Sequence, residues 1–250
     1  MLTQAKTTTE ITAMRKSGQI LAKVLDSLKK EVQPGVTTKA LADMAALELK
    51  KLGGQPAFLG YQGFPDVLCV SVNDEVVHGI PRADKVIQDG NIVSLDFGVI
   101  YQNMITDGAI SVIVGNAKPQ VRHLLETTEK SLMSGIDAVR AGKKTGDIGS
   151  AVESVLGPKG YGIVRDLVGH GVGHHLHEEP NIPNYGVKNS GVMLSKHMTV
   201  AIEPMATLGT DQVYVADDGW TVKTRDGSWA AHFEHTILIT QDGAEILTAL

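Results

Sequence analysis

Three acidic residues stand in stretches where apolar side chains dominate. Asp96 lies inside NIVSLDFGVI, Glu203 inside TVAIEPMA and Glu234 inside AAHFEHTILIT. Burying an unpaired carboxylate is costly, so each of the three needs a cation or a set of hydrogen-bond donors. A single carboxylate in a strand more often faces solvent or an arginine. Several of them in one chain favour a shared binding site.

Asp96 also forms a pair with Asp107. Both belong to one predicted hairpin, SLDFGVIYQNMITDGAISV, and they lie 11 positions apart. If the turn centres on Tyr101-Gln102, the two side chains face each other with Cβ atoms about 4.5–5.5 Å apart, where like charges repel. Amid apolar neighbours the pair needs positive charge between its members, and a metal ion supplies it. The alternative is a slipped register that leaves one aspartate in the turn.

The segment 167–180, LVGHGVGHHLHEEP, holds four of the nine histidines. Its glycines let the backbone approach a ligand closely. The pair His174-His175 is typical of a surface tract, whereas His170 and His177 have glycine or leucine neighbours that indicate burial. Hard oxygen donors with one nitrogen suit Mn, Fe(II), Co or Zn, and so many carboxylates suit two divalent ions. The candidate ligands are His170, Asp96, Asp107, Glu203 and Glu234.

The elements that must position these residues follow from apolar periodicity and from capping and turn residues. Two helices, a β-rich stretch, two more helices and a second β-rich stretch are predicted at about 7–30, 37–52, 58–114, 119–141, 145–156 and 162–250. A motif supports duplication, because Val32, Gly35, Thr38 and Gly53 recur 107 positions later as Val139, Gly142, Thr145 and Gly160.

This order predicts an α+β fold in which helices cover one face of an antiparallel sheet. We expect one domain over residues 1–250, with pseudo-symmetric halves at about 1–115 and 116–250.

Composition excludes several classes of function. The 250 residues carry 23 basic and 28 acidic side chains, a net charge of −5, so nothing favours a nucleic acid or an anionic membrane as the main partner. The single cysteine, Cys69, permits no internal disulfide and fits a reducing compartment. In an apolar strand its thiol would have a raised pKa, which disfavours a role as nucleophile. With no signal-peptide pattern and no apolar run long enough to span a membrane, we expect a cytoplasmic protein.

Six segments together resemble the methionine aminopeptidases of the pita-bread metallopeptidase family. They occur in the family's order across essentially the whole chain: NDEVVHGIP (73–81), SLDFGV (94–99), MITDG (104–108), GHGVGHHLHEEP (169–180), AIEPM (201–205) and FEHT (233–236). The resemblance implies the pita-bread fold and removal of the initiator methionine from peptides and nascent chains whose second residue is small. Co-translational processing in this family also implies transient contact with the ribosome. No exposed repeat demands an assembly, so we expect a monomer.

The resemblance implies a dinuclear metal centre. By analogy Asp107 and Glu234 bridge the two ions, Asp96 chelates one, and His170 with Glu203 binds the other. Two ions generate a hydroxide near neutral pH and polarise the scissile carbonyl.

The same analogy assigns three catalytic side chains. Glu203 would move the proton from water to the leaving amine. His177 would stabilise the carbonyl oxygen, and His78 would contact the nitrogen of the second substrate residue. Without the family match, His78 in VVHGIP would be interpreted as a hydrogen-bonded histidine at the end of a strand.

The resemblance also implies an apolar pocket that binds the methionine side chain of the substrate. Only 4% of the residues are aromatic, yet three of them fall within 58–64. The implied lining residues are Phe58, Tyr61, Phe64, Cys69, Leu176 and Trp220, with His78 and His177 at the reacting bond.

Four positions depart from the family pattern. Gly108 stands where threonine is common, which predicts looser support of Asp107. Leu176 replaces a frequent aromatic residue and Phe58 a smaller one, which puts a strict preference for methionine in question. His197 stands where a glycine usually precedes the methionine.

Two other functions fit parts of the pattern. A proline-specific aminopeptidase shares the fold, but such relatives usually carry a substantial N-terminal domain that is not found here. A non-catalytic binding protein would typically lose metal ligands, whereas all five are kept together with both histidines. The 31 positions from Glu203 to Glu234 leave no room for the helical insertion of type II enzymes, and we expect no N-terminal zinc-binding extension. The sequence therefore resembles the short bacterial type I form.

Overall fold

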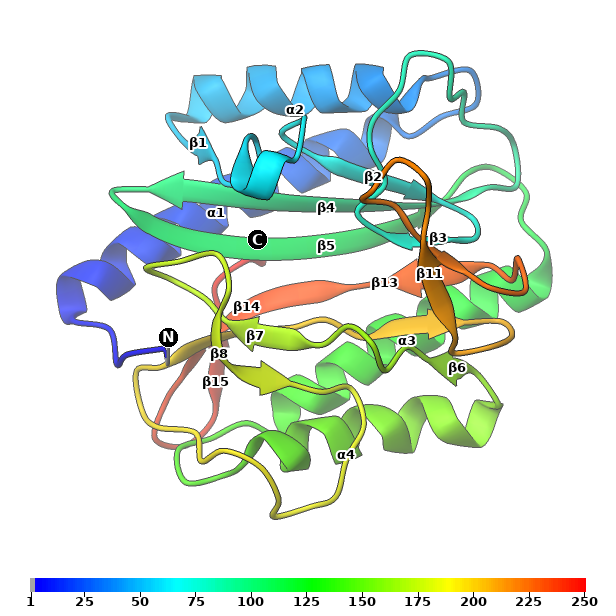
Figure 1. Ribbon diagram of the computed structural model, residues 1–250. Coiled ribbons are helices and arrows are strands. Elements are labelled where there is room, and N and C mark those ends of the chain that lie inside the picture. Colours follow the sequence, from blue (N-terminus) through cyan, green and yellow to red (C-terminus); the bar gives the residue numbers. More distant parts are fainter. Residues whose placement is uncertain (1–2) are drawn as a thin grey trace.

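The computed structural model describes residues 3–250, which form four α-helices and two short 3₁₀ helices (Figure 1). Helix α3 ends at Asp137, four residues before the predicted end, and Ala141 N donates a hydrogen bond to Thr240 O outside the helix instead of continuing the helical pattern. None of the helices in the described residues is long and apolar enough to cross a membrane. The helices are α1 (Thr8–Glu31), α2 (Thr38–Leu52), η1 (Tyr61–Gly63), α3 (Pro119–Asp137), α4 (Thr145–Leu156) and η2 (Gly157–Lys159).

One nine-stranded antiparallel sheet forms the centre of the fold. Its main path runs β1-β4-β5-β14-β9-β7-β8, with β2 paired to β4 and β15 paired to β14. The strands are β1 (Gln55–Pro56), β2 (Cys69–Val72), β4 (Ile92–Tyr101), β5 (Met104–Ile113), β7 (Gly169–Gly171), β8 (Glu178–Ile182), β9 (Thr199–Ile202), β14 (Glu234–Ile239) and β15 (Ala244–Ile246).

Two three-stranded antiparallel sheets accompany the main one, in the orders β13-β10-β6 and β11-β12-β3. Their strands are β3 (Glu75–Val77), β6 (Gly162–Ile163), β10 (Met205–Thr207), β11 (Val213–Val215), β12 (Val222–Thr224) and β13 (Ala230–His232).

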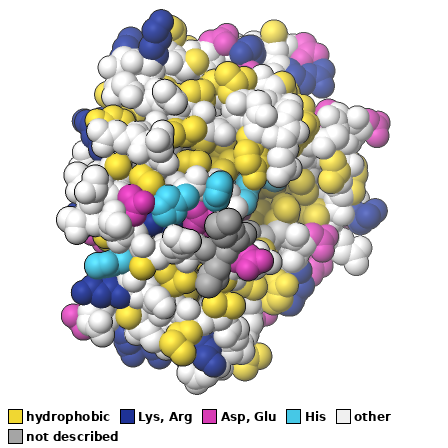
Figure 2. Space-filling model, turned by 60° about the vertical axis from the view of Figure 1, so that its left-hand side comes forward, with side chains coloured by type: hydrophobic (Ala, Val, Ile, Leu, Met, Phe, Trp, Pro, Cys, Tyr) yellow, Lys and Arg dark blue, Asp and Glu magenta, His cyan; other side chains and the backbone are white. Residues whose placement is uncertain are grey.

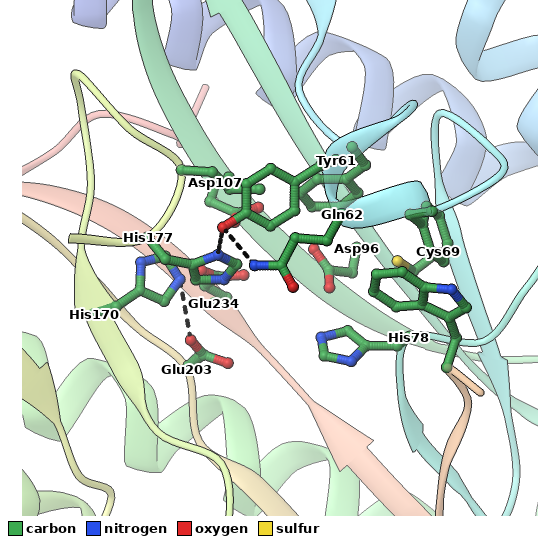
Figure 3. Close-up of a pocket in the computed structure, with 14 residues that line it drawn as sticks. Tyr61, Gln62, Cys69, His78, Asp96, Asp107, His170, His177, Glu203 and Glu234 are labelled. Atoms are coloured by element: carbon green, nitrogen blue, oxygen red, sulfur yellow. Dashed lines mark hydrogen bonds and ion pairs between the residues drawn. The ribbon is translucent and has the colours of Figure 1, made fainter. Parts of the chain in front are cut away.

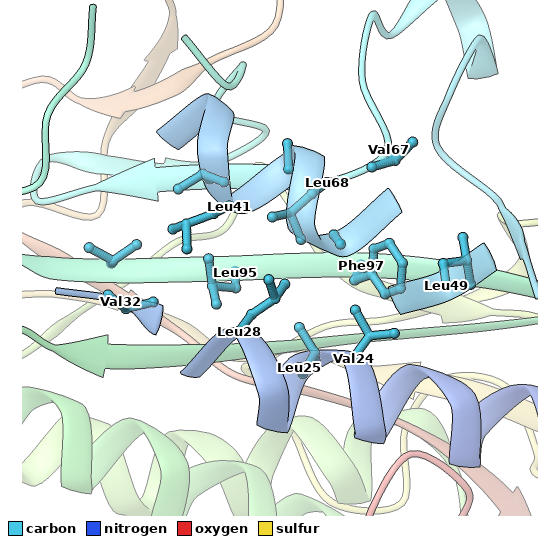
Figure 4. Close-up of a cluster of buried hydrophobic side chains, with 14 of the residues drawn as sticks. Val24, Leu25, Leu28, Val32, Leu41, Leu49, Val67, Leu68, Leu95 and Phe97 are labelled. Carbon is cyan, nitrogen blue, oxygen red and sulfur yellow. The ribbon is translucent and has the colours of Figure 1, made fainter. Parts of the chain in front are cut away.

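Both helix pairs lie on one face of the main sheet, as the α+β prediction required (Figure 1). The capping box of Thr7 and Glu10 opens α1, and Gly53 ends α2 in a left-handed conformation. Alternate side chains of β4, among them Leu95 and Phe97, point toward the helices and are completely buried (Figure 4). Because successive side chains of a strand face opposite ways, Asp96 is left on the other face of the sheet.

The hairpin between β4 and β5 corrects the predicted register. Its turn is at Gln102-Asn103 rather than Tyr101-Gln102, because both turn residues take positive φ (49° and 63°), as the favoured two-residue hairpin turn requires. Asp96 therefore lies opposite Ala109 and not opposite Asp107. The two aspartates are diagonal neighbours that share one face, so the predicted direct opposition is wrong while the shared face is kept.

The second half repeats the backbone hydrogen bonds of the first at an offset of 107 positions. Gly35 N donates to Ile87 O and Gly142 N donates to Leu194 O, each at 2.9 Å. Two isolated bridges are related by the same offset, Thr37–Val86 and Lys144–Met193. The weak sequence echo thus corresponds to equivalent backbone geometry in the two α-α-β halves.

His197 occupies a backbone position that suits glycine. Its φ is 68°, in the left-handed region, and the position 107 residues earlier is Gly90 with φ 84°. Its backbone groups are held on both sides, since His197 N donates to Ile239 O and His197 O accepts from Lys6 N. A histidine here carries left-handed strain that a glycine would not.

We expect His197→Gly to have a free energy of unfolding about 1 kcal/mol above that of His197→Ala, because only glycine relieves the left-handed strain. At an ordinary position alanine is the more stabilising residue, so the expected order is the reverse of the usual one. Urea unfolding of the two variants measures the difference. Equal stability, or a more stable alanine variant, would contradict the assigned strain.

Candidate metal centre and substrate pocket

Five neighbouring strands in the middle of the main sheet position the five predicted metal ligands. These strands are β4, β5, β14, β9 and β7, which are consecutive in the sheet. Each bears one ligand within it or directly after it: Asp96 on β4, Asp107 on β5, Glu234 on β14, Glu203 after β9 and His170 on β7. Residues separated by up to 138 positions in the sequence are thereby brought to one place (Figure 3).

The register of the strands places three carboxylates on one face. Ala109 of β5 pairs with Asp96 on one side and with Glu234 on the other. Asp107 precedes Ala109 by two positions and so points the same way. The strand register therefore places the side chains of Asp96, Asp107 and Glu234 next to one another.

Asp96 and Glu203 are equivalent positions in the two halves, 107 residues apart. Each lies equally far along the chain from the first residue of its strand, which is Ile92 in β4 and Thr199 in β9. Each half therefore contributes one carboxylate from the same place in its sheet.

The carboxyl groups of the cluster are buried without a cation among the described residues to neutralise them. Asp96, Asp107 and Glu234 are 8%, 4% and 3% exposed. Burial first, and then repulsion from the other carboxylates, raises the pKa of Asp96 and of Glu234 well above the ordinary range. The pKa of Glu203 is raised in the same way. Burial also raises the pKa of Asp107, to about 7.

His170 presents an unprotonated nitrogen to these carboxylates. Its Nδ1 lies 2.9 Å from Gly171 O, a carbonyl that can only accept, so Nδ1 carries the proton. Nε2 is therefore bare, and it faces Glu203 with Oε1 at 3.4 Å (Figure 3). Burial lowers the pKa of His170 to about 3, which keeps the ring neutral. A neutral imidazole whose other nitrogen is fixed by a carbonyl is the usual form of a metal-ligating histidine.

The donor set fits divalent cations. One ligand atom each from Asp107, His170 and Glu234 lie within 4.8 Å of one another. Asp96 Oδ1 and Glu234 Oε1 are buried and accept no hydrogen bond from any described residue. Buried oxygens without donors are costly, and a cation is the partner that satisfies several at once.

Backbone contacts support Asp107 although Gly108 has no side chain. Gly108 N donates to Asp107 Oδ1 at 3.0 Å, and Thr236 Oγ1 binds both the N–H and the carbonyl of Asp107. A Cβ at position 108 would lie 3.1 Å from Leu21 Cδ2, so Leu21 fills the space that a threonine would need.

An apolar pocket opens beside the carboxylates. Figure 2 shows hydrophobic side chains gathered in a hollow with histidines at its rim. Phe64 packs edge-on against Trp220 and Phe58, with ring centroids 5.2 and 6.5 Å away. All thirteen predicted site residues line this pocket: Phe58, Tyr61, Phe64, Cys69, His78, Asp96, Asp107, His170, Leu176, His177, Glu203, Trp220 and Glu234.

Cys69 lies on β2 directly opposite Asp96. Burial, and then the nearby carboxylates, raises the pKa of its thiol well above the ordinary value. The thiol therefore stays neutral and forms part of the pocket wall, in keeping with the prediction that it is no nucleophile.

Two histidines flank the cluster in neutral form. Burial lowers the pKa of His78 to about 4, and His78 takes a left-handed φ of 58° that turns it out of β3 toward Trp220. Partial burial lowers the pKa of His177, and its ring lines the pocket. The ring centroids of His177 and His170 are 4.3 Å apart.

A buried ion pair fixes the loop that carries His177. The Lys6 side chain is fully buried, and its Nζ donates to Glu178 Oε2 at 3.4 Å and to Thr3 Oγ1 at 2.9 Å. Thr3 N donates to the carbonyl of Glu179 at 2.6 Å. The segment from Thr3 to Lys6 thereby lies against the loop that carries His177.

Three further residues at the site were missed from the sequence. Gln62 lines the pocket, and Lys6 supports the loop that carries His177. His232 is 1% exposed, with Nε2 3.8 Å from Glu203 Oε2, and neither of its ring nitrogens has a hydrogen-bond partner in residues 3–250. The position of His232 inside the apolar run AAHFEHTILIT, two residues before Glu234, was a signal that could have found it.

Comparisons with known proteins agree with this geometry. The chain is 46% identical to a methionine aminopeptidase of Aquifex aeolicus over 96% of both chains. The crystal structure of a methionine aminopeptidase from Thermotoga maritima is 44% identical and superposes with a TM-score of 0.98 over the full length of both. A prolidase from Pyrococcus furiosus, 24% identical, shares the fold with a TM-score of 0.79. The superposition covers 98% of the present chain and 65% of the prolidase.

The model of metallopeptidase family M24 matches residues 12–241. This range includes every candidate ligand and every residue of the apolar pocket. The chain belongs to metallopeptidase family M24.

Proposed function

We propose that this protein is a methionine aminopeptidase of the bacterial type I form. It removes the N-terminal methionine from peptides and nascent proteins when the second residue is small. The observation that carries the proposal is the meeting of three buried carboxylates, the half-buried Glu203 and one unprotonated imidazole nitrogen at the edge of an apolar pocket. The relatives named methionine aminopeptidase support this choice of substrate.

The five ligands hold two divalent ions in this proposal. Four carboxylates carry more negative charge than one divalent ion neutralises, and oxygen donors with one nitrogen suit Mn, Fe(II), Co or Zn. Such ions would activate a water molecule and polarise the scissile carbonyl. The proposed ligands are Asp96, Asp107, His170, Glu203 and Glu234.

Three side chains are proposed to handle protons and the substrate. Glu203, at 14% side-chain exposure, accepts the proton of the attacking water and passes it to the leaving amine. His177 donates a hydrogen bond to the carbonyl oxygen as charge develops on it. His78 contacts the nitrogen of the second substrate residue. Both histidines suit hydrogen bonding because their lowered pKa values keep them neutral.

The apolar pocket is proposed to bind the methionine side chain. A thioether packs favourably at the edges of aromatic rings, and Phe64 and Trp220 offer such edges. Phe58 and Leu176 are both buried in the wall, so the bulk added at position 58 is offset by the smaller side chain at 176. This balance supports retention of the methionine preference.

The cellular setting follows from the activity. We propose a cytoplasmic monomer that acts on emerging N-termini and contacts the ribosome transiently. The excess of acidic over basic residues supports neither a membrane surface nor sequence-specific nucleic acid as a partner.

A peptide series tests the activity. After chelation the protein should cleave none of Met-Ala-Ser, Met-Leu-Ser and Ala-Pro-Ala. Restoring Mn or Co should give cleavage of Met-Ala-Ser, with little of Met-Leu-Ser because its second residue is bulky. Release of free methionine, followed by chromatography, is the measurement. Preference for Ala-Pro-Ala would assign the protein to the proline-specific branch, and no cleavage in the presence of bound metal would refute the proposed enzyme.

Removal of a ligand should abolish both turnover and tight metal binding. Asp107→Asn and Glu234→Gln should each lower kcat at least about 100-fold, because loss of a residue that merely supports a ligand already costs 10–100-fold. Metal content after dialysis and kcat on Met-Ala-Ser are measured together. Asp147→Asn is the matched control, since this buried aspartate caps α4 away from the site. Full activity in either ligand variant would contradict the ligand set.

The metal-free protein should lose stability as pH rises from about 4 to about 7. The pKa of Asp107 is about 7 in the folded chain but about 3.9 when unfolded, so the folded state binds more protons in this window and its stability falls with pH. Divalent ions replace those protons, so their stabilising effect should grow over the same range. Urea unfolding at pH 5 and pH 7, with chelator or saturating metal, measures this. Equal metal stabilisation at the two pH values would contradict the assignment.

A further inference from the structure

The Tyr61 hydroxyl does more than line an apolar wall. It lies 2.8 Å from Nδ1 of His177 and accepts a hydrogen bond from Nε2 of Gln62 at 3.3 Å (Figure 3). The rings of Tyr61 and His177 are also in contact, with centroids 5.3 Å apart. The three side chains form a short chain of hydrogen bonds that ends at the ring facing the substrate.

Gln62 is held in this chain by an unusual backbone. Within η1 its φ is 47°, and the glycines on either side, Gly60 and Gly63, have φ of 81° and 92°. A non-glycine residue in the left-handed region is uncommon, and such strain concentrates at functional sites. Here the conformation directs the amide of an otherwise exposed side chain at the Tyr61 hydroxyl.

The direction of the hydrogen bonds follows from the inventory of protons. The Gln62 Nε2 group can act only as a hydrogen-bond donor, so it donates to the Tyr61 oxygen. The single Tyr61 proton is then available to its other neighbour, Nδ1 of His177, and Nδ1 accepts it in the arrangement that uses every donor of the chain. A neutral imidazole that accepts at Nδ1 carries its proton on Nε2.

We propose that the Gln62–Tyr61 pair is a positioning device that fixes His177 in the tautomer with its proton on Nε2. The inference rests on the proposed function, in which that proton is donated to the carbonyl oxygen of the substrate. Tyr61 and Gln62 act through His177 and are positioning residues.

His170 supplies the contrast within the same site. Its Nδ1 faces the acceptor Gly171 O and keeps the proton, which leaves Nε2 bare toward the carboxylates. The Nδ1 of His177 faces a hydroxyl that donates, which leaves Nε2 protonated. Two rings with centroids 4.3 Å apart thereby take opposite tautomers, one suited to a metal and the other to an oxyanion.

Nitrogen NMR of the zinc-loaded protein, labelled with ¹⁵N in its histidine rings, tests the proposal. Protonated and bare ring nitrogens have distinct shifts, and the His177 signals are identified by their absence in His177→Gln. We expect the wild-type His177 to be protonated at Nε2. Tyr61→Phe should give a mixture of tautomers. Gln62→Glu should favour the opposite one, because a carboxylate accepts the hydrogen bond that the Tyr61 hydroxyl donates, and the hydroxyl oxygen then accepts from Nδ1.

The chain offers a matched control for the spectra. Tyr161 forms the same kind of contact with Nδ1 of His123 at a surface away from the pocket. Tyr161→Phe should therefore change the signals of His123 and leave those of His177 as they are. A His177 proton on Nδ1 in the wild type, or a His177 tautomer unchanged in Tyr61→Phe, would overturn the proposal.

Kinetics on Met-Ala-Ser separate positioning from packing. Tyr61→Phe keeps the ring, so KM should change little while kcat falls about 10-fold, less than the roughly 10²–10³-fold loss when an oxyanion donor is removed outright. An increase in KM with unchanged kcat would mean that the hydroxyl serves binding only, and would overturn the proposal. If the wild type cleaves no methionine peptide but shows the expected tautomer, the proposed function fails and the tautomer assignment remains.

Discussion

The mutual repulsion of buried carboxylates is the constraint on which this structure depends. Asp96, Asp107 and Glu234 are buried, and the half-buried Glu203 lies beside them. Among the described residues no lysine or arginine pairs with the four carboxylates, and only the neutral rings of His170 and His232 approach one of them. Left without cations, the cluster binds protons and its pKa values rise. Divalent ions are the natural counter-charge, so the site is at once a source of instability and a strong metal-binding centre.

The fold tolerates this cluster because rigid elements hold it from every side. Five adjacent strands supply the ligands, and the opposite face of β4 is anchored by Leu95 and Phe97 in the helical core. The two halves each place a carboxylate at the same point, Asp96 in one and Glu203 in the other. A centre at the junction of two equivalent halves receives similar support from both, which suits a site where small displacements of ligands matter.

Much of this could be predicted from the sequence, for physical reasons. Carboxylates inside apolar runs are conspicuous, and the helices follow from their periodicity and caps, as with Thr7 and Glu10. The hairpin turn was misplaced by one residue, because Tyr101-Gln102 and Gln102-Asn103 both satisfy the polar pattern and only the left-handed backbone of Asn103 decides. Lys6 was missed because its role depends on a contact with the distant Glu178, which no local pattern encodes. Gln62 was missed because it acts only through Tyr61, whose hydroxyl contacts the distant His177. His232 stood in a conspicuous apolar run, and that local signal was not used.

The segment from Thr3 to Lys6 has a practical consequence for the recombinant protein. Its buried lysine and the hydrogen bond from Thr3 to Glu179 fix the start of the described chain beside the loop that carries His177. An affinity tag fused upstream of Thr3 begins beside this loop, whose His177 lines the pocket proposed to bind substrate N-termini. Such a tag would compete with substrate at high local concentration, and its proteolytic removal would register as activation of the enzyme.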